Sequence, residues 1–204
     1  MATVILDRDV AERLRQERAA LGLDRWDEVW EGTYMMAPLP NPEHQQIAIR
    51  LGAIFEDTVG WNDETIVLAG TNVSDRHKGW LHNYRCPDVA VYLPGTQARK
   101  YRTHFFGGPD FAVEIMSDDD RTRDKIPFYS NVGTRELLIV DRDPWSLELL
   151  RLSGKKLKSV GVSSGKRGRF LESRVLPLRF RLIGRKVRPT IEVIRTTDGK
   201  TWSV

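Results

Sequence analysis

Apolar side chains recur at helical spacing in two segments near the N-terminus. In residues 7 to 22 they stand among Arg and Glu, and Gly22 follows as a stop signal. A second segment begins at Asn41 and Pro42, a pair typical of a helix cap and first turn. Its apolar positions are Ile47, Leu51, Ile54 and Phe55. The pattern predicts two amphipathic helices with a short strand pair around Gly32 between them.

From residue 66 onward the apolar runs are short and are bounded by Gly, Pro and Asp, which is typical of β-strands. The first four runs are Ile66 to Ala69, Asp88 to Leu93, Phe111 to Met116 and Glu136 to Val140. A short helix, about Thr122 to Val132, falls between the last two and tolerates Pro127 in or near its first turn. Four later runs also alternate enough to be strands: Leu147 to Leu152, Lys156 to Val160, Arg179 to Ile183 and Ile191 to Arg195. The pattern predicts an α/β protein with a mixed sheet, a crossover helix and a β-rich tail.

One residue breaks the apolar pattern of the strands. Glu114 stands in the middle of the run Phe111 to Met116, where an ionised carboxylate is costly unless it is compensated. Asp88 opens the preceding strand, and Lys125 begins the helix that leaves the strand of Glu114. We expect the strands on either side of the loop 94–110 to be neighbours, so that both carboxylates converge. A hard divalent cation would relieve their repulsion, and a lysine beside it could orient a water or stabilise charge on a phosphate.

Each of these residues also has a purely structural interpretation that the sequence leaves open. An Asp that follows a Pro at a strand entry, as Asp88 does, is common turn chemistry. Glu114 could instead form a buried salt bridge with an arginine such as Arg135, and Lys125 could be a surface lysine. Three further acids, Asp118, Asp119 and Asp120, fit stabilisation of the following helix N-terminus better than metal binding.

Charge is divided unevenly along the chain, although the net charge is only +4. Residues 151 to 204 hold 15 Lys or Arg against three acids, and the first 150 residues hold 17 Lys or Arg against 25 acids. This asymmetry favours a polyanionic partner held by the C-terminal part, the alternative being a solvated β-face. If the partner is DNA, the basic residues of segment 153–170 are the candidate phosphate contacts: Lys155, Lys156, Lys158, Lys166, Arg167 and Arg169.

The remaining composition excludes several classes of protein. A single cysteine, Cys86, excludes an intrachain disulfide framework and a cysteine-based zinc cage, and the four histidines lack zinc-ligand spacing. No run approaches the roughly 18 apolar residues that span a bilayer. The first charged residue, Asp7, follows only six uncharged ones, which is too short for the apolar core of a signal peptide. The cytoplasm is therefore the simplest location. Without a repeat or a low-complexity linker, residues 1–204 are expected to form one domain.

The order of these motifs resembles a known family. Pro87-Asp88, the strand Phe111 to Ser117 with its central Glu, and the segment Lys125 to Pro144 are similar to the Uma-two family of the PD-(D/E)XK nuclease superfamily. The resemblance runs from about Trp26 to Leu152. It implies a restriction-endonuclease-like α/β fold with a mixed sheet flanked by helices. The nuclease core would be about 24–152, and a basic β-rich extension about 153–204.

The resemblance also suggests roles for individual residues. The usual superfamily lysine stands two residues after the acid, where this chain has Met116. Lys125 resembles the family variant in which the lysine has moved to the next helix. The family also has a glutamate before a Gly in the first strand pair and a His at the start of the following helix, which here are Glu28 and His44.

The sequence thus predicts a metal-dependent endonuclease that hydrolyses DNA phosphodiester bonds with Mg²⁺ or Mn²⁺. Asp88 and Glu114 would hold the metal, Glu28 would support it, and Lys125 would assist the attacking water. The resemblance leaves a homodimer open, because two sites would cut two strands. Two alternatives remain: a catalytically inactive nucleic-acid-binding module of the same fold, and a structural or partner-binding protein.

Overall fold

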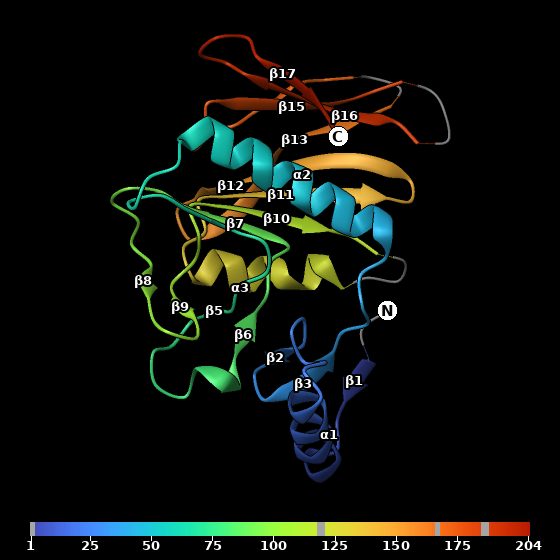
Figure 1. Cartoon of the computed structure of the whole chain (residues 1–204), viewed down its shortest axis with the longest axis vertical. Helices are drawn as coiled ribbons and strands as arrows, with labels where there is room; N and C mark the ends of the chain where they lie inside the picture. Colours follow the sequence, from blue (N-terminus) through green and yellow to red (C-terminus); the bar gives the residue numbers. More distant parts are fainter. Residues whose placement is uncertain (1–2, 118–120, 166–167, 185–187) are drawn as a thin grey trace.

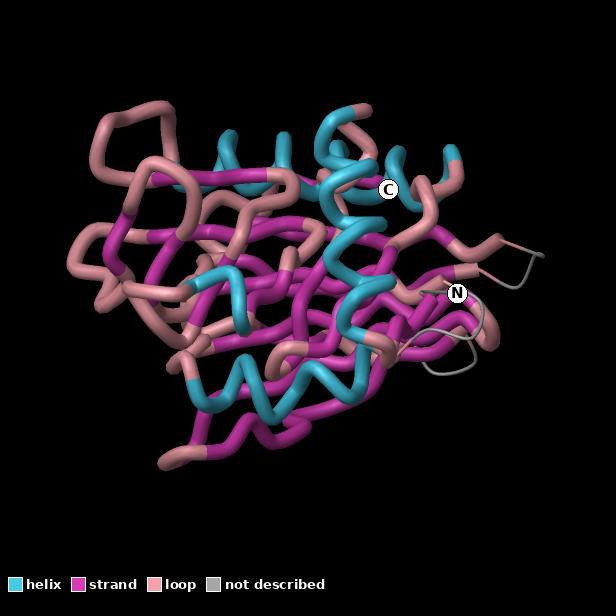
Figure 2. Tube along the Cα trace, turned by 90° about the horizontal axis from the view of Figure 1, so that it is seen from below, coloured by secondary structure: helices cyan, strands magenta, loops and turns pink. Residues whose placement is uncertain are grey.

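The computed structural model describes residues 3–117, 121–165, 168–184 and 188–204. Asp118, Asp119, Asp120, Lys166 and Arg167, which the sequence singled out, lie outside the described residues. Within the described ranges the chain forms three β-sheets and three α-helices (Figure 1). Seen from below, the strands form the broad body of the molecule (Figure 2).

The central sheet has six strands in the order β13-β12-β11-β10-β7-β4. Their bounds are β4 (Ile66–Leu68), β7 (Val89–Tyr92), β10 (Phe111–Ile115), β11 (Glu136–Arg142), β12 (Trp145–Ser153) and β13 (Lys156–Ser164). Strands β10 and β11 are parallel, whereas the other neighbouring pairs are antiparallel. The chain crosses from β10 to β11 through a 3-10 helix (Thr122–Lys125) and α3 (Ile126–Asn131). This is the mixed sheet with a crossover helix that the sequence predicts.

The two faces of the central sheet pack in separate hydrophobic clusters. Successive side chains of a strand point to opposite faces, so Phe111, Val113 and Ile115 enter one cluster while Ala112 enters the other. The second cluster contains Phe128 and Tyr129 of α3. By the same alternation Glu114 shares the face of Ala112, and its side chain is directed toward α3.

The first face is covered by α2 (Pro42–Val59) and by the C-terminal sheet. That sheet consists of β14 (Leu171–Glu172), β15 (Leu178–Ile183), β16 (Thr190–Arg195) and β17 (Thr201–Ser203). Phe55 of α2 meets Phe111 and Phe180 edge to face, and all three rings are fully buried. Arg195 and Lys200 bind Asp57 near the C-terminal end of α2. The basic tail therefore adds apolar side chains to the same core as the central sheet.

The N-terminal sheet has the order β1-β3-β2-β6-β5-β9-β8 and extends in Figure 1 from the left of α3 (β8) to below it (β1, β2 and β3). Its strands are β1 (Thr3–Ile5), β2 (Glu28–Trp30), β3 (Thr33–Met36), β5 (Val73–Ser74), β6 (Tyr84–Arg85), β8 (Arg99–Lys100) and β9 (Phe105–Phe106). A 3-10 helix, Trp80–His82, precedes β6, and α1 (Arg8–Ala20) follows β1. Arg18 of α1 forms two hydrogen bonds to the buried Asp27 beside β2, at 2.6 and 2.9 Å, and Tyr34 donates a third. This polar cluster fixes α1 to the strand that carries Glu28.

The crossover helix differs from its predicted form. The sequence predicts one helix over about Thr122 to Val132, whereas a tight 3-10 turn occupies the first four residues and α3 begins at Ile126. Pro127 explains the change, because its ring would clash with the carbonyl four residues earlier in a continuous α-helix. Lys125 consequently stands at the junction, immediately before α3.

No helix within the described ranges is long and apolar enough to cross a membrane.

Candidate active site

The register of two strands places Asp88 beside Glu114. Strands β7 and β10 pair antiparallel, with Val113 opposite Val89. Continuing this register by one residue sets Asp88 opposite Glu114. Asp88 Oδ2 accepts a 2.7 Å hydrogen bond from the Ile115 backbone N–H, which holds the carboxylate at the end of β10. The neighbour relation expected from the 94–110 loop is therefore present.

Glu114 is the most deeply placed carboxylate of the pair. Its residue is 3% exposed, Tyr129 of α3 donates a hydrogen bond to Oε1, and Lys125 Nζ donates one to Oε2 at 3.0 Å. Burial raises the pKa of Glu114 to about 8; Lys125 opposes this shift, while Asp88 and Glu28 add to it. An added positive charge near Glu114 would favour its ionised form.

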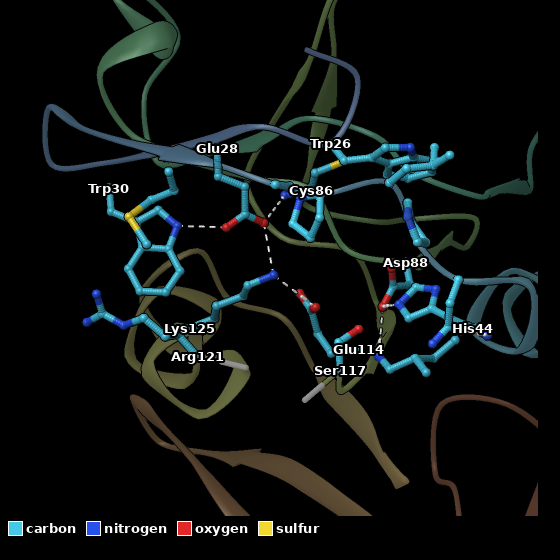
Figure 3. A pocket seen from close by; sticks show the side chains of 17 residues that line it. Trp26, Glu28, Trp30, His44, Cys86, Asp88, Glu114, Ser117, Arg121 and Lys125 are labelled. Atoms are coloured by element: carbon cyan, nitrogen blue, oxygen red, sulfur yellow. Dashed lines mark hydrogen bonds and ion pairs between the residues drawn. The ribbon is translucent and has the colours of Figure 1, made fainter. Parts of the chain in front are cut away.

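Lys125 connects two carboxylates from opposite sides of the pocket. Its Nζ lies 2.9 Å from Glu28 Oε1 and 3.0 Å from Glu114 Oε2. Because Lys125 ends the 3-10 turn that follows β10, the crossover returns its side chain to the edge where Glu114 stands. Figure 3 shows the ammonium group between the two carboxylates.

Glu28 is fixed by groups that the sequence did not identify. Its Oε2 accepts a 2.7 Å hydrogen bond from Trp30 Nε1, and its Oε1 accepts one of 2.8 Å from the Cys86 backbone N–H. Trp30 stands two residues after Glu28 and therefore on the same face of β2, a spacing that could have signalled the contact. The Cys86 contact joins residues 58 positions apart, and no local pattern predicts it.

His44 stands in the first turn of α2, where the resemblance suggested a histidine, and its side chain lies beside Asp88. Asn41 caps α2 by accepting a 2.9 Å hydrogen bond from the His44 backbone N–H, which fixes the first turn of the helix. From that turn His44 Nε2 reaches Asp88 Oδ2 at 3.2 Å. Its buried Nδ1 has no hydrogen-bond partner within the described part of the chain.

These side chains line one cavity of about 290 Å³ (Figure 3). Three carboxylates, those of Glu28, Asp88 and Glu114, face two permanent cations, Lys125 and Arg121. The rest of the lining comes mainly from the loop before α2 and from the tryptophans Trp26 and Trp30. The cavity is therefore a negatively charged recess at the end of β10.

The donor set fits a hard cation. Mg²⁺ prefers carboxylate oxygens and usually binds one or two of them together with waters and substrate phosphate oxygens. Asp88 and Glu114 supply two such groups, and the pKa of Glu114 is raised by burial first and by the charges of Asp88 and Glu28 after it, against the opposing effect of Lys125. Among the described residues, no group of three or more His, Cys, Asp or Glu side chains is placed so that it could hold a metal ion.

The four predicted phosphate contacts that the structure describes, Lys155, Lys156, Lys158 and Arg169, do not line this cavity. Lys155 and Lys156 stand at the turn between β12 and β13, where Ser153 pairs with Lys156. Through the pairs Arg151–Glu136 and Glu136–Phe111, this turn belongs to the Phe111 end of the sheet, opposite the Glu114 end. Lys158 and Arg169 are exposed, but neither lines the cavity.

The salt bridge between Glu114 and Arg135, expected if Glu114 were only structural, is absent from the described contacts. Arg135 instead lies 3.1 Å from Asp110, at the opposite end of β10. Glu114 contacts Lys125 and Tyr129.

The architecture and the site can now be compared with known proteins. The crystal structure of a protein titled a "putative nuclease belonging to DUF820" from Anabaena variabilis superposes with a TM-score of 0.57 and 18% identity, covering 72% of this chain and 80% of that chain. The fold is thus restriction-endonuclease-like, as predicted. No curated protein matches the chain.

The family model Uma2, described as "Putative restriction endonuclease", matches residues 22–183. The chain belongs to the Uma2 family, and the resemblance inferred from its motifs is confirmed. At the family level this places it among the nucleases. The match also extends beyond Leu152, into the C-terminal sheet.

Proposed function

We propose that this protein is a metal-dependent endonuclease that hydrolyses phosphodiester bonds of DNA in the cavity at the end of β10. The observation that carries the proposal is the contact of Lys125 with both Glu28 and Glu114 in a recess that Asp88 also lines. This contact joins a carboxylate of the N-terminal sheet to one of the central sheet. Family membership supports the class of reaction.

In this proposal Asp88 and Glu114 hold Mg²⁺ or Mn²⁺, and Glu28 supports the same ion. The ion would polarise the scissile phosphate and lower the pKa of the attacking water. Tyr129 fixes the orientation of Glu114 through its hydrogen bond. Trp30 and the Cys86 N–H do the same for Glu28.

Lys125 provides the positive charge that the reaction needs. Its ammonium lies within 3.0 Å of both carboxylates, so it can donate a hydrogen bond to a water or to a phosphate oxygen held between them. His44 contacts Asp88 and would hold that carboxylate in place. The contacts of Glu28, Glu114 and Lys125, and that of His44 with Asp88, support the roles proposed for these residues.

The test is cleavage of supercoiled plasmid in Mg²⁺, Mn²⁺ or EDTA. We expect nicking that needs the metal and falls by about 100-fold or more in Glu114→Gln and in Lys125→Ala, because each removes a group that stabilises the transition state. Matched controls are Glu192→Gln and Lys200→Ala, which remove salt-bridged side chains of the C-terminal sheet. Both controls should nick like the wild type.

Two results would contradict the proposal. Nicking that survives Glu114→Gln or Lys125→Ala would mean that the site is elsewhere. Tight, salt-sensitive DNA binding without nicking in either metal would identify a binding module that has lost turnover.

A further inference from the structure

The loop between β3 and α2 exposes a leucine at the rim of the cavity. Leu39 is 81% exposed and stands between Pro38 and Pro40, and all three residues line the cavity. Single exposed leucine side chains are common on protein surfaces, but this one borders the cavity that contains the three carboxylates and Lys125. Its position is therefore relevant to what enters the cavity.

The loop is fixed at both ends. The Ala37 N–H donates a 2.8 Å hydrogen bond to Asp27, and Arg18 donates one of 3.2 Å to the Ala37 carbonyl. At the other end Gln45 Nε2 donates one of 2.7 Å to the Pro40 carbonyl. The two prolines also restrict the backbone. Leu39 is thus presented outward by a rigid support and is not left exposed by a loose segment.

The rest of the rim is aromatic, and the floor is charged. Trp26 packs so closely on Gly70 that a Cβ on Gly70 would lie 2.2 Å from its ring. Trp30 carries the guanidinium groups of Arg85 and Arg121 over its ring, at 4.5 and 5.2 Å, so the apolar part of the rim is formed by Leu39, its flanking prolines and Trp26. An occupant should therefore have a flat apolar group for the rim and, immediately next to it, an anionic group for Lys125, Arg121 or a metal ion that the carboxylates would hold.

A nucleotide of an unpaired strand has this chemistry, because its base is free beside its phosphate. A base in an intact duplex is stacked and paired, so it offers a groove edge but no open ring face to an apolar rim. Apolar side chains that contact bases commonly act by inserting at an unstacked step.

We propose that the site takes an unpaired nucleic-acid strand and that Leu39 packs against the base next to the phosphate in the cavity. This inference rests on the proposed function and names its substrate class. It makes Leu39 a specificity-determining residue.

The experiment measures binding by fluorescence anisotropy with Ca²⁺ in place of Mg²⁺, so that the carboxylates can hold a cation for the phosphate, and each probe is checked to be intact afterwards. The labelled probes are dT20, rU20, a 20-bp duplex, and the same duplex with a central six-nucleotide bubble. We expect Leu39→Ser to raise the Kd of unpaired and bubble probes by about 5- to 10-fold, and that of the duplex by less than about 2-fold. Comparison of dT20 with rU20 distinguishes DNA from RNA as the source of the strand.

The matched control is Ile49→Ser. Ile49 is 68% exposed on α2 and does not line the cavity, so its removal tests the loss of an exposed apolar side chain as such. We expect no change in any Kd.

The inference and the proposed function can fail separately. An equal effect of Leu39→Ser on all probes, no effect on any, or no binding of unpaired probes by the wild type would overturn the inference, even if plasmid is nicked. The expected pattern in a protein that nicks nothing would uphold strand recognition and overturn the nuclease.

Discussion

At the residue scale, the site is defined by one carboxylate in an apolar strand. Glu114 is tolerated because Tyr129 and Lys125 occupy both of its oxygens. The sequence could predict Glu114 because it interrupts a run of core residues. It could not predict Trp30 or Cys86 as partners of Glu28, because those contacts depend on side-chain direction and on pairing between distant segments.

The raised pKa of Glu114 predicts a dependence of stability on pH. Its pKa is about 8 in the folded chain, against an ordinary value of 4.5, so the folded state binds more protons between these limits. Its contribution to stability is therefore full below the ordinary pKa and is lost as pH rises toward 8. Glu114→Gln, which stays neutral, should lose less stability over this interval. We expect the Tm of Glu114→Gln minus the Tm of the wild type to increase by about 3 °C or more between pH 5 and pH 8.5.

Thermal unfolding at pH 5 and pH 8.5 in EDTA measures this difference, and Glu192→Gln is the control. If the Tm of the wild type and that of Glu114→Gln change equally between the two pH values, the raised pKa of Glu114 is contradicted. Added Mg²⁺ at pH 8.5 should stabilise the wild type more than Glu114→Gln, since the ion favours the ionised carboxylate.

At the element scale, the long periodic segments could be predicted and the short ones could not. Helices α1 and α2 and strands β10 and β11 lie where apolar spacing places them. The two-residue strands β5, β6, β8 and β9 carry too few residues for any period, and they exist because neighbouring strands of the N-terminal sheet pair with them. The start of α3 depends on Pro127, which the sequence shows but whose exact effect on the preceding turn required the structure.

The attachment of α1 to the N-terminal sheet can be tested through Asp27. Asp27 is 1% exposed and accepts hydrogen bonds from Arg18, Tyr34 and the Ala37 N–H. We expect Asp27→Asn to cost about 2–4 kcal/mol of unfolding free energy, because it leaves a partly buried guanidinium without its counter-charge. Asp27 also adjoins Glu28, so nicking should fall as well.

Asp57→Asn is the matched control, since it removes an exposed carboxylate that binds Lys200 and Arg195. Its cost should stay below about 1 kcal/mol. Urea unfolding of both variants measures these energies, and similar losses would show that the Asp27 cluster is not a special anchor.

At the scale of the whole molecule, the described lysines of segment 153–170 and the candidate site lie at different ends of the central sheet. The turn between β12 and β13 carries Lys155, Lys156 and Lys158 at the Phe111 end of the central sheet, and the acidic cavity is at the Glu114 end. The uneven charge was visible in the sequence. The sequence did not show that these lysines lie far from the site, because their position follows from the strand register.

We expect the triple substitution of Lys155, Lys156 and Lys158 by Ala to weaken DNA binding and to reduce the slope of log K against log salt by about 1–3, while the rate of nicking at saturating DNA is unchanged. The matched triple is Arg99, Lys100 and Arg102 to Ala, exposed basic residues in and beside β8 of the N-terminal sheet. A larger effect of the second triple substitution would mean that nucleic acid contacts the N-terminal sheet near β8 and not the turn between β12 and β13. Salt titrations of anisotropy measure both slopes.

The contact of Lys125 with Glu28 and Glu114 also affects how the protein is made. In many small metalloproteins the ion supplies the folding free energy, and the chain is unfolded without it. Here a lysine of the chain itself offsets part of the negative charge of the recess. If the proposed function holds, the newly synthesised protein would complete its fold in an ion-poor environment and bind its metal afterwards, so that its maturation and its activity would be separated in time.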